Sequence, residues 1–268
     1  MSETSTQGWA VITGASSGLG AIFAERFAER NMPLVLAGRD EARLEQVRRR
    51  VHGRAPGLEV EVVTGDLGTR EGVDDLITAI GNRDVGVLVN NAGFGTHGRV
   101  AETDAQRDHE LVAVNIDALV RLTHALMPGM LARKRGGILN VASAIAFQPA
   151  PYQATYGASK AFVLSFSQAL GAEVKGSGVT VTALCPGPTR TGFVDALGAD
   201  VSNVAVYKLM SDPDPVVEAG LRAFDRGQAV VVPGLRTRVL ATISKSLPAS
   251  ISTAVSARML RPAKAVAS

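Results

Sequence analysis

The sequence predicts an α/β fold made of a single doubly wound domain, with a parallel sheet of about seven strands and helices on both of its faces. Short runs rich in Val, Ile and Leu alternate along the chain with longer stretches of helical periodicity. The first of these runs leads directly into a glycine-rich segment. The chain contains 28 Gly but only 4% aromatic residues, a composition that suits aliphatic strands joined to helices by tight turns.

The predicted elements follow one another closely from the N-terminal end. A strand at Trp9–Thr13 ends at Gly14, and the next segment places apolar residues on one face at a helical period. The second strand, 33–37, ends at Gly38 and leads into a charged helix from residue 40 to about residue 52. The remaining expected strands are 59–64, 85–90, 137–143, 179–185 and 229–232, and the remaining expected helices are 70–80, about 105–133 and 153–175.

Strands separated by helices of this length pair in parallel through right-handed crossovers, which gives a Rossmann-type sheet. Ligands of such sheets bind beyond the carboxyl ends of the strands, near the point where the strand order reverses. The sequence contains no internal repeat or linker, and 268 residues with 46% hydrophobic content can form one core. We therefore expect a dinucleotide-binding catalytic domain over residues 1–232 and a basic amphipathic tail over residues 233–268.

Charge and cysteine content limit the partners. From Arg226 to the end the chain carries 7 Lys or Arg and no acid, whereas the preceding part carries 21 basic and 25 acidic residues. No basic cluster is interleaved with aromatic residues, so we expect no nucleic-acid binding. The single cysteine, the polar segment 1–7 and the lack of an uncharged apolar run of ~20 residues predict a cytoplasmic protein without a transmembrane helix.

The segment after the first strand predicts a dinucleotide site. It reads Thr-Gly-Ala-Ser-Ser-Gly-Leu-Gly, so its glycines allow a tight turn and the following helix directs N–H groups at a pyrophosphate. Such a turn also occurs as an ordinary strand-to-helix loop, and its position after the first strand favours the functional interpretation. The candidate contacts are Gly14, Ser16, Ser17, Gly18, Leu19 and Gly20.

The end of the second strand predicts which cofactor is bound. An NAD site would place Asp or Glu there against the ribose hydroxyl, but the residues are Ala37-Gly38-Arg39. A carboxylate would repel the additional phosphate of NADP(H), whereas Arg39 can pair with it, so the sequence favours NADP(H). Asp66, after the third strand, could accept from the adenine amine, with capping of the helix that starts near Arg70 as its alternative role.

Tyr156 and Lys160 lie four residues apart in a predicted helix, which puts both side chains on one face about one turn apart. A phenol with a free pKa near ~10 is a weak acid–base group at neutral pH, and an adjacent ammonium favours its ionised form. Tyr156 could then exchange a proton with a carbonyl or alcohol oxygen. Ser143, at the end of the preceding strand, can donate to the same oxygen, and Asn115 is a poor helix former within the long helix.

Together these motifs resemble those of the short-chain dehydrogenase/reductase family, over roughly residues 8–232. The matching positions are Thr13 to Gly20, Asp66, Leu67, Asn90, Asn91, Ala92, Gly93, Asn115, Ser143, Tyr156, Lys160, Pro186, Gly187 and Thr191. The position before Gly18, often basic in NADP users of the family, is Ser17. The cofactor prediction therefore depends mainly on Arg39.

The resemblance implies further roles for these positions. Lys160 would also bind the nicotinamide ribose, and Asn115 would hold a water in a proton relay through Lys160. The remaining implied cofactor contacts are Leu67, Asn91, Ala92 and Gly93 towards the adenosine, and Pro186, Gly187, Thr189 and Thr191 around the nicotinamide. Members of the family commonly form dimers or tetramers through two long helices, so we expect a homodimer or homotetramer.

By the same resemblance, residues 189–228 supply a lid over the substrate. Its apolar residues predict a hydrophobic ketone, aldehyde or secondary alcohol as the substrate, although packing into the core would also explain them. The candidate substrate contacts are Phe94, Phe147, Tyr152 and Phe193. His97 and Arg99 follow the Asn-Asn-Ala-Gly segment and are expected in a solvated loop.

The tail repeats apolar residues every four positions, with Arg and Lys between them and Pro248 as an interruption. This pattern predicts two amphipathic helices, which either dock on the body or a partner subunit or lie on an anionic membrane surface. The four histidines have no metal-ligand spacing, and Cys185 is expected in a buried strand, so no metal site is predicted.

The leading hypothesis is an NADPH-dependent carbonyl reductase or alcohol dehydrogenase in which Tyr156 is the acid/base. One alternative is a catalytically silent dinucleotide-binding protein with a regulatory or scaffolding role, which the set of Asn115, Ser143, Tyr156 and Lys160 argues against. Another is an S-adenosylmethionine methyltransferase, which shares the glycine-rich turn. That alternative requires an acidic residue after the second strand and gives the Tyr156/Lys160 pair no role.

Overall fold

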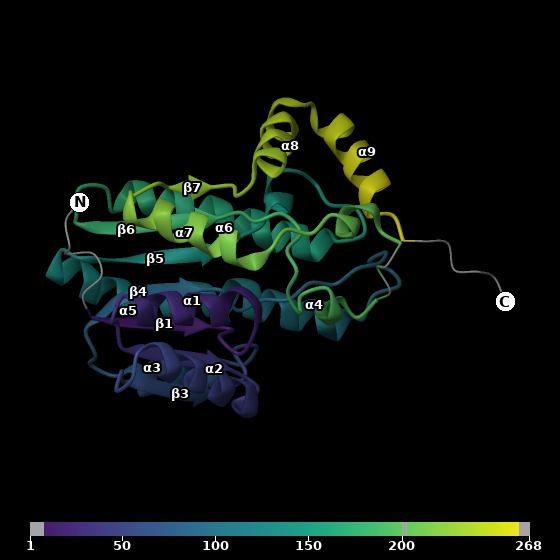
Figure 1. Cartoon of the computed structure of the whole chain (residues 1–268). Helices are drawn as coiled ribbons and strands as arrows, with labels where there is room; N and C mark the ends of the chain where they lie inside the picture. The colour runs from purple at the N-terminus through teal and green to yellow at the C-terminus, as the bar shows by residue number, and fades with distance from the viewer. Residues whose placement is uncertain (1–7, 200, 202, 263–268) are drawn as a thin grey trace.

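The computed structural model describes residues 8–262 apart from residues 200 and 202, so the expectations for segment 1–7 and for residues 263–268 of the tail lie outside the described residues. The described chain is built on one parallel sheet of seven strands in the order β3-β2-β1-β4-β5-β6-β7 (Figure 1). The strands are β1 (Trp9–Thr13), β2 (Leu34–Gly38), β3 (Val60–Thr64), β4 (Val85–Asn90), β5 (Gly136–Val141), β6 (Val179–Leu184) and β7 (Val230–Val231). This order confirms the predicted doubly wound, Rossmann-type sheet.

Different helices cover the two faces of the sheet. Ala10 and Ile12 of β1 belong to one buried apolar cluster and Val11 to the other, because successive strand residues point to opposite faces. The first cluster is completed by α1 (Gly18–Glu29), α2 (Glu41–Arg54) and α7 (Pro213–Asp225). The second is completed by α3 (Arg70–Ile80), α5 (Ala118–Arg133) and α6 (Ala154–Glu173).

The predicted helix 105–133 is present, but it contains a π-helical turn. Its parts are α4 (Ala105–Val112), the π segment η2 (Ala113–Asp117) and α5. Among the described residues this helix alone has the length and mean hydropathy to cross a membrane. Its α5 part packs on β4 and β5, where Leu122 is buried in the second cluster, as in the core helix of an α/β domain.

The segment 189–228 divides into two parts. Its second half contains α7, a helix that the sequence analysis does not predict and that packs on α1. Arg26 of α1 forms ion pairs with Asp214 and Glu218 of α7, each at 2.8 Å. The first part contains the short helices η4 (Asp195–Leu197) and η5 (Ala205–Lys208). Its residues that line the cavity at the strand ends are Thr189, Thr191, Gly192, Phe193, Val194, Ala196, Val206 and Tyr207.

The tail forms the two predicted helices, α8 (Leu235–Ser246) and α9 (Ala249–Leu260), separated at Pro248. Figure 1 shows this hairpin, in yellow, projecting beyond β7 at the end of the sheet to which the strand arrows point. It packs on the body of the protein, as one of the expected alternatives stated: α8 contacts η3 (Ala144–Phe147), and α9 contacts η5.

The strand order fixes where a ligand can lie. Because β1 pairs with β2 on one side and with β4 on the other, the chain winds away from β1 in both directions. The carboxyl ends of β1 and β4 consequently frame the crevice of a doubly wound sheet. Thr13 ends β1 and Asn90 ends β4, so the segments that follow these two residues border the crevice.

Candidate active site

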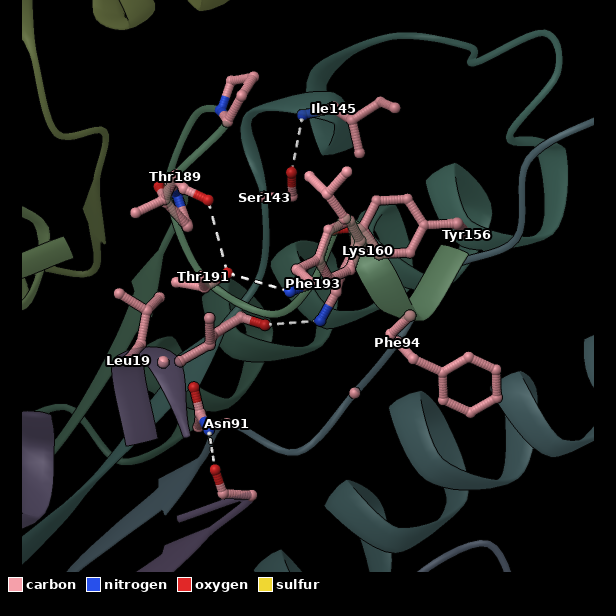
Figure 2. Close-up of a pocket in the computed structure, with 18 of the residues that line it drawn as sticks. Leu19, Asn91, Phe94, Ser143, Ile145, Tyr156, Lys160, Thr189, Thr191 and Phe193 are labelled. Carbon is pink, nitrogen blue, oxygen red and sulfur yellow. Dashed lines mark hydrogen bonds between the residues drawn. The ribbon is translucent and has the colours of Figure 1, made fainter. Parts of the chain in front are cut away.

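A cavity of about 1140 Å³ occupies this crevice and extends from the glycine-rich turn to the C-terminal hairpin. Figure 2 shows Leu19 and Asn91 at one side of it and Ser143, Tyr156 and Lys160 at another. The expected contacts that line the cavity are Gly14, Ser16, Ser17, Gly18, Leu19, Arg39, Asp66, Leu67, Asn91, Ala92, Gly93, Phe94, Ser143, Tyr156, Lys160, Pro186, Gly187, Thr189, Thr191 and Phe193. Four expected contacts do not line it, namely Gly20, Asn115, Phe147 and Tyr152.

The glycine-rich turn is shaped by contacts that leave no space for side chains. Gly14 and Gly18 have φ angles of +64° and +54°, a left-handed region that L-residues rarely adopt. A Cβ on Gly20 would lie 2.3 Å from the carbonyl oxygen of Gly14, so Gly20 allows the close packing of α1 on the turn rather than contacting the cavity. Ser17 caps α1 without a side-chain hydrogen bond, so its hydroxyl is not used by the helix.

Asn91 and Thr13 fasten this turn to the end of β4. The amide nitrogen of the Asn91 side chain donates to the carbonyl oxygens of Thr13 and Gly14, at 2.9 and 3.1 Å. The hydroxyl of Thr13 accepts from the backbone N–H groups of Asn91 and Ala92, both at 3.0 Å. The Asn91 side chain therefore supports the turn, and only its remaining surface faces the cavity.

Arg39 lies at the rim of the cavity, directly after β2. Its side chain is exposed and makes no hydrogen bond or ion pair with residues 8–262 as far as the structure describes them. Arg43, which was not predicted as a contact, lies at the same rim on the first turn of α2. Its Nε is 3.3 Å from Asp40 Oδ2. Two guanidinium groups thus border this end of the cavity, although Arg43 is already paired.

Asp66 does not cap α3, which corrects its alternative role. Thr69 is the N-cap residue, and its hydroxyl accepts from the backbone N–H of Gly72 at 3.0 Å. Asp66 instead accepts from the backbone N–H of Gly68 at 2.8 Å, and its side chain lines the cavity.

Tyr156 and Lys160 project from one face of α6 into the cavity wall. Both are buried, with 7% and 5% of their surface exposed, and the Lys160 ammonium lies 5.9 Å from the centre of the Tyr156 ring. Lys160 Nζ donates to the carbonyl oxygen of Val141 at 2.9 Å, which ties the lysine to the end of β5 (Figure 2). Ser143 follows that strand, and its side chain lines the same cavity as the Tyr156 phenol.

Burial dominates the acidity of both groups. It raises the pKa of Tyr156 above its ordinary value, and the nearby Ser143 hydroxyl only partly opposes this shift. Burial also lowers the pKa of Lys160 to about 8. The sequence predicts that the adjacent ammonium favours ionisation of the phenol. In this cavity burial has the larger effect, so Tyr156 is held in its protonated form.

Asn115 lies in the π-helical turn η2, with its side chain turned away from the cavity. Its amide nitrogen donates to Phe94 O and Ser159 Oγ, both at 3.0 Å, and its oxygen accepts from the Phe94 N–H at 3.1 Å. A Cβ on Gly93 would lie 2.8 Å from Asn115 Oδ1 and 3.4 Å from Lys160 Nζ. The Asn115 side chain is therefore a structural support for the loop after β4 and for α6.

The apolar part of the cavity is lined by only two of the four expected substrate contacts, Phe94 and Phe193. The ring of Phe193 packs 5.2 Å from that of Tyr156, and Phe94 lies in the same cluster. Phe147 instead lies under the ammonium of Lys245, 4.2 Å from its ring centre, and Tyr152 is outside the cavity at a turn with φ of +67°. Their places are taken by Val206, from the expected lid, and by residues that were not predicted as substrate contacts, which are Gln148, Gln153, Tyr207, Leu240, Ala241, Ser244, Val255, Ser256, Met259 and Leu260.

Arg99 is exposed, as expected of a solvated loop, but His97 is not. Its ring is buried, and Nε2 donates to the carbonyl oxygen of Leu260 at 2.9 Å, which fastens the end of α9. Burial lowers the pKa of His97. Among the residues that the structure describes, no group of three or more His, Cys, Asp or Glu could hold a metal ion.

Comparisons with known proteins place the chain in a family. The family model for short chain dehydrogenases matches residues 8–202. The very-long-chain 3-oxoacyl-CoA reductase of Anas platyrhynchos is 38% identical over 184 residues, which are 66% of this chain and 58% of that protein.

Two of the similar solved structures cover nearly all of this chain. A short-chain dehydrogenase from Sphingobium yanoikuyae in complex with NADPH has a TM-score of 0.79 and 34% identity, covering 97% of this chain and 98% of that one. The bulky-bulky ketone specific alcohol dehydrogenase from Comamonas testosteroni has a TM-score of 0.75 and 31% identity, covering 98% of both chains.

Proposed function

Because the chain belongs to the short-chain dehydrogenase/reductase family, whose members are oxidoreductases, we propose that it is an NADPH-dependent reductase of a hydrophobic ketone or aldehyde. The reverse oxidation of a secondary alcohol uses the same groups. The observation that carries this proposal is the buried, protonated phenol of Tyr156 beside Ser143 and Lys160 in the wall of the large cavity.

The residues along the cavity fit NADP(H). The turn at Gly14 and Gly18 leaves the backbone bare at the start of α1, where a pyrophosphate is favoured by helix N–H groups. Arg39, which has no partner in the described chain, suits the extra phosphate, and Arg43 adds a second cation at the same rim. Asp66 and Leu67 suit the adenine, and Pro186 to Thr191 suit the nicotinamide.

When bound in this cavity, NADPH would supply the hydride that reduces the carbonyl carbon. Tyr156 donates its phenolic proton to the carbonyl oxygen, and Ser143 donates a hydrogen bond to the same oxygen. Burial suits this direction, because it keeps the phenol protonated until charge develops on the oxygen. Lys160 supplies a positive charge that stabilises Tyr156 once its proton has left. It would also hold the ribose hydroxyls of a bound cofactor.

Asn115 contributes to proton supply through its backbone rather than its side chain. The side-chain amide of Asn115 already donates to Phe94 and Ser159. Its backbone lies in a π-helical turn, which interrupts the regular hydrogen bonds of the long helix. We propose that the water of the proton relay binds at the backbone of this π-helical turn, next to Gly93 and Lys160.

The surface of the long helix and of α6 supports an assembly of several copies. Family members often form oligomers, and Val112, Leu131 and Phe162 are exposed apolar residues of the long helix and α6, so we propose a homodimer or homotetramer through these helices. We place the catalytic unit in residues 1–232, with residues 233–268 as an added cap, and expect a cytoplasmic location.

The hairpin also presents an outward surface. Val239, Ile243 and Ile251 are about half exposed beside basic residues such as Arg236 and Arg238, so a peripheral contact with an anionic membrane is proposed. Sedimentation with anionic liposomes, compared with a chain ending at Val232, tests it. Equal partitioning of the two chains contradicts the membrane contact.

Titration with NADPH, NADH and S-adenosylmethionine, followed by a panel of ketones, tests the main proposal. We expect NADPH to bind most tightly and to be oxidised with at least one bulky apolar ketone. Tight NADPH binding without turnover of any ketone would support a silent dinucleotide-binding protein instead, and a preference for S-adenosylmethionine would support a methyltransferase.

A further inference from the structure

Arg107, in α4, is a cation that the proposed reaction does not use. Its side chain does not line the cavity, and it makes no ion pair with any residue that the structure describes. Its Nη2 instead donates to the carbonyl oxygen of Ala196 at 2.5 Å, although the two residues are 89 positions apart in the sequence. This bond connects α4 to the η4 segment, which comprises residues 192–198 around that short helix.

The guanidinium of Arg107 contacts two separate parts of the chain. Its Cζ lies 5.0 Å from the centre of the Phe94 ring, in a cation–π contact with the loop after β4. A Cβ on Gly198 would lie 3.4 Å from Arg107 Nε, so the backbone that follows η4 also passes close to the guanidinium. Arg107 therefore joins the loop after β4 to the η4 segment.

The η4 segment extends from Arg107 to the catalytic tyrosine. The backbone N–H of Ala196 donates to the carbonyl oxygen of Phe193 at 3.2 Å, and the Phe193 ring packs 5.2 Å from that of Tyr156. A Cβ on Gly95 would lie 3.0 Å from side-chain atoms of both Phe193 and Leu197, and 3.3 Å from Tyr156. Because these three side chains meet at one point, a shift of η4 must move Phe193 relative to Tyr156.

A role in stability alone does not explain an arginine at this position. The Nε of Arg107 is buried and has no hydrogen-bond partner among the described residues. A buried donor without a partner and a charge without a carboxylate both disfavour the folded state. An uncharged side chain of similar length would fill the same space without these costs. What the guanidinium adds is a charge-assisted hydrogen bond to Ala196, which fixes one point of the η4 segment.

We propose that Arg107 is a positioning residue: by holding the carbonyl group of Ala196 it fixes Phe193 against Tyr156 and so sets the width of the apolar part of the cavity. Phe193 and Ala196 line the cavity, so Arg107 acts through them without touching the substrate. When the η4 segment is loosened, a small ketone is held less firmly beside the phenol, whereas a bulky ketone fills the added space. This inference rests on the proposed reductase function.

Arg107→Met tests the proposal, because it removes the charge and every donor but keeps a long side chain over Phe94. The substrates are the smallest and the largest aromatic ketone that the wild type reduces, for example acetophenone and benzophenone. For the small ketone kcat/KM should fall by about tenfold, as expected for loss of a bond from a charged donor, and for the bulky ketone by less than about threefold. Arg107→Lys, which can donate to Ala196, should restore part of the difference. An equal decrease for both ketones, or no decrease, overturns the proposal.

Arg83→Met is the matched control, because Arg83 makes the same two kinds of contact elsewhere. Its guanidinium lies 4.8 Å from the centre of the Trp9 ring and donates to the carbonyl oxygen of Ile80 at 3.0 Å. Arg83 does not line the cavity. This variant should have a lower melting temperature but the wild-type preference between the two ketones. The same change of preference in Arg83→Met and Arg107→Met would show a general effect of instability and would overturn the positioning role.

Hydrogen exchange without ketone separates failure of the positioning role from failure of the proposed reaction. The backbone N–H groups of Ala196 and Leu197 are bonded within the η4 segment, so their exchange reports its local opening. Exchange of a peptide covering residues 193–198 should be at least about threefold faster in Arg107→Met and unchanged in Arg83→Met. If no ketone is reduced but this difference is found, the reaction is wrong and the positioning of η4 stands. If ketones are reduced and exchange is equal in all three proteins, only the positioning role is wrong.

Discussion

The ammonium of Lys160 lies 5.9 Å from the centre of the Tyr156 ring, while its Nζ donates a hydrogen bond to Val141 at 2.9 Å. The lysine is thereby anchored to β5 at the same time as it faces the phenol one helical turn away. Two buried titratable groups in contact with one cavity give the site a pH dependence that can be measured.

The rate of ketone reduction should fall as the pH rises above about 8. Lys160 has its pKa lowered to about 8 by burial, so it loses its charge above that pH and can no longer stabilise the deprotonated Tyr156. We expect kcat/KM to approach a tenfold decrease per pH unit on this limb. A profile that stays level up to pH 10 contradicts the role of Lys160.

Measurements of stability distinguish loss of catalysis at high pH from unfolding of the protein. Because the pKa of Lys160 is depressed in the folded state, the unfolded chain binds more protons above pH 8, and the contribution of Lys160 to the free energy of unfolding increases with pH there. Cys185 opposes it from about pH 9, because burial raises the pKa of this thiol from 9.0 to about 12. Melting temperatures measured at pH 8 and 9 serve as the control.

Arg39→Ser should weaken the use of NADPH specifically. Loss of charge-assisted hydrogen bonds to a phosphate corresponds to ~1.5–3 kcal/mol, so KM for NADPH should rise by about ten- to a hundredfold. KM for NADH should change little. Arg43→Ser, which removes a guanidinium that is already paired with Asp40, should have a smaller effect. Equal losses with NADPH and NADH would show that Arg39 does not read the extra phosphate.

Gly93→Ala should reduce kcat without unfolding the protein. The new methyl group would lie 2.8 Å from Asn115 Oδ1 and 3.4 Å from Lys160 Nζ, so it must displace the loop after β4 or the lysine. A displacement near 1 Å in a catalytic group can lower the rate by about a hundredfold.

Gly53→Ala provides the control for this substitution. Apart from its chain neighbours and the backbone of α2 itself, no atom lies within 4 Å of the position of its Cβ, so this change should leave kcat unaltered and stabilise the helix by up to ~1 kcal/mol. Wild-type kcat in Gly93→Ala would show that the spacing of Asn115 and Lys160 does not matter.

The sequence identifies the parts of the fold that local patterns determine. The bounds of Trp9–Thr13 and Arg70–Ile80 agree with the structure, because each element is a periodic run with a clear stop at both ends. Tyr156, Lys160 and Ser143 are found because one helix and one strand end fix their positions.

What the sequence does not reveal depends on contacts between distant segments. Helix α7 is missed because the resemblance assigns the whole segment 189–228 to the lid, although Val217 and Leu221 pack into the core. Phe147 and Tyr152 are misplaced because their orientation depends on the docking of α8 and on a left-handed turn. Tyr207 and Ser256 could not be found, since only the packing of α9 on η5 brings them to the cavity.

The most direct test of the account is the rate of hydride transfer in a single turnover of Tyr156→Phe with NADPH and a ketone that the wild-type enzyme reduces. The variant keeps the ring that packs on Phe193 and lacks only the proton donor, so its melting temperature and NADPH affinity should stay close to wild type. We expect the rate to fall by about 10²–10⁴-fold, as for loss of a general acid. A rate within about twofold of the wild type would contradict proton donation by Tyr156.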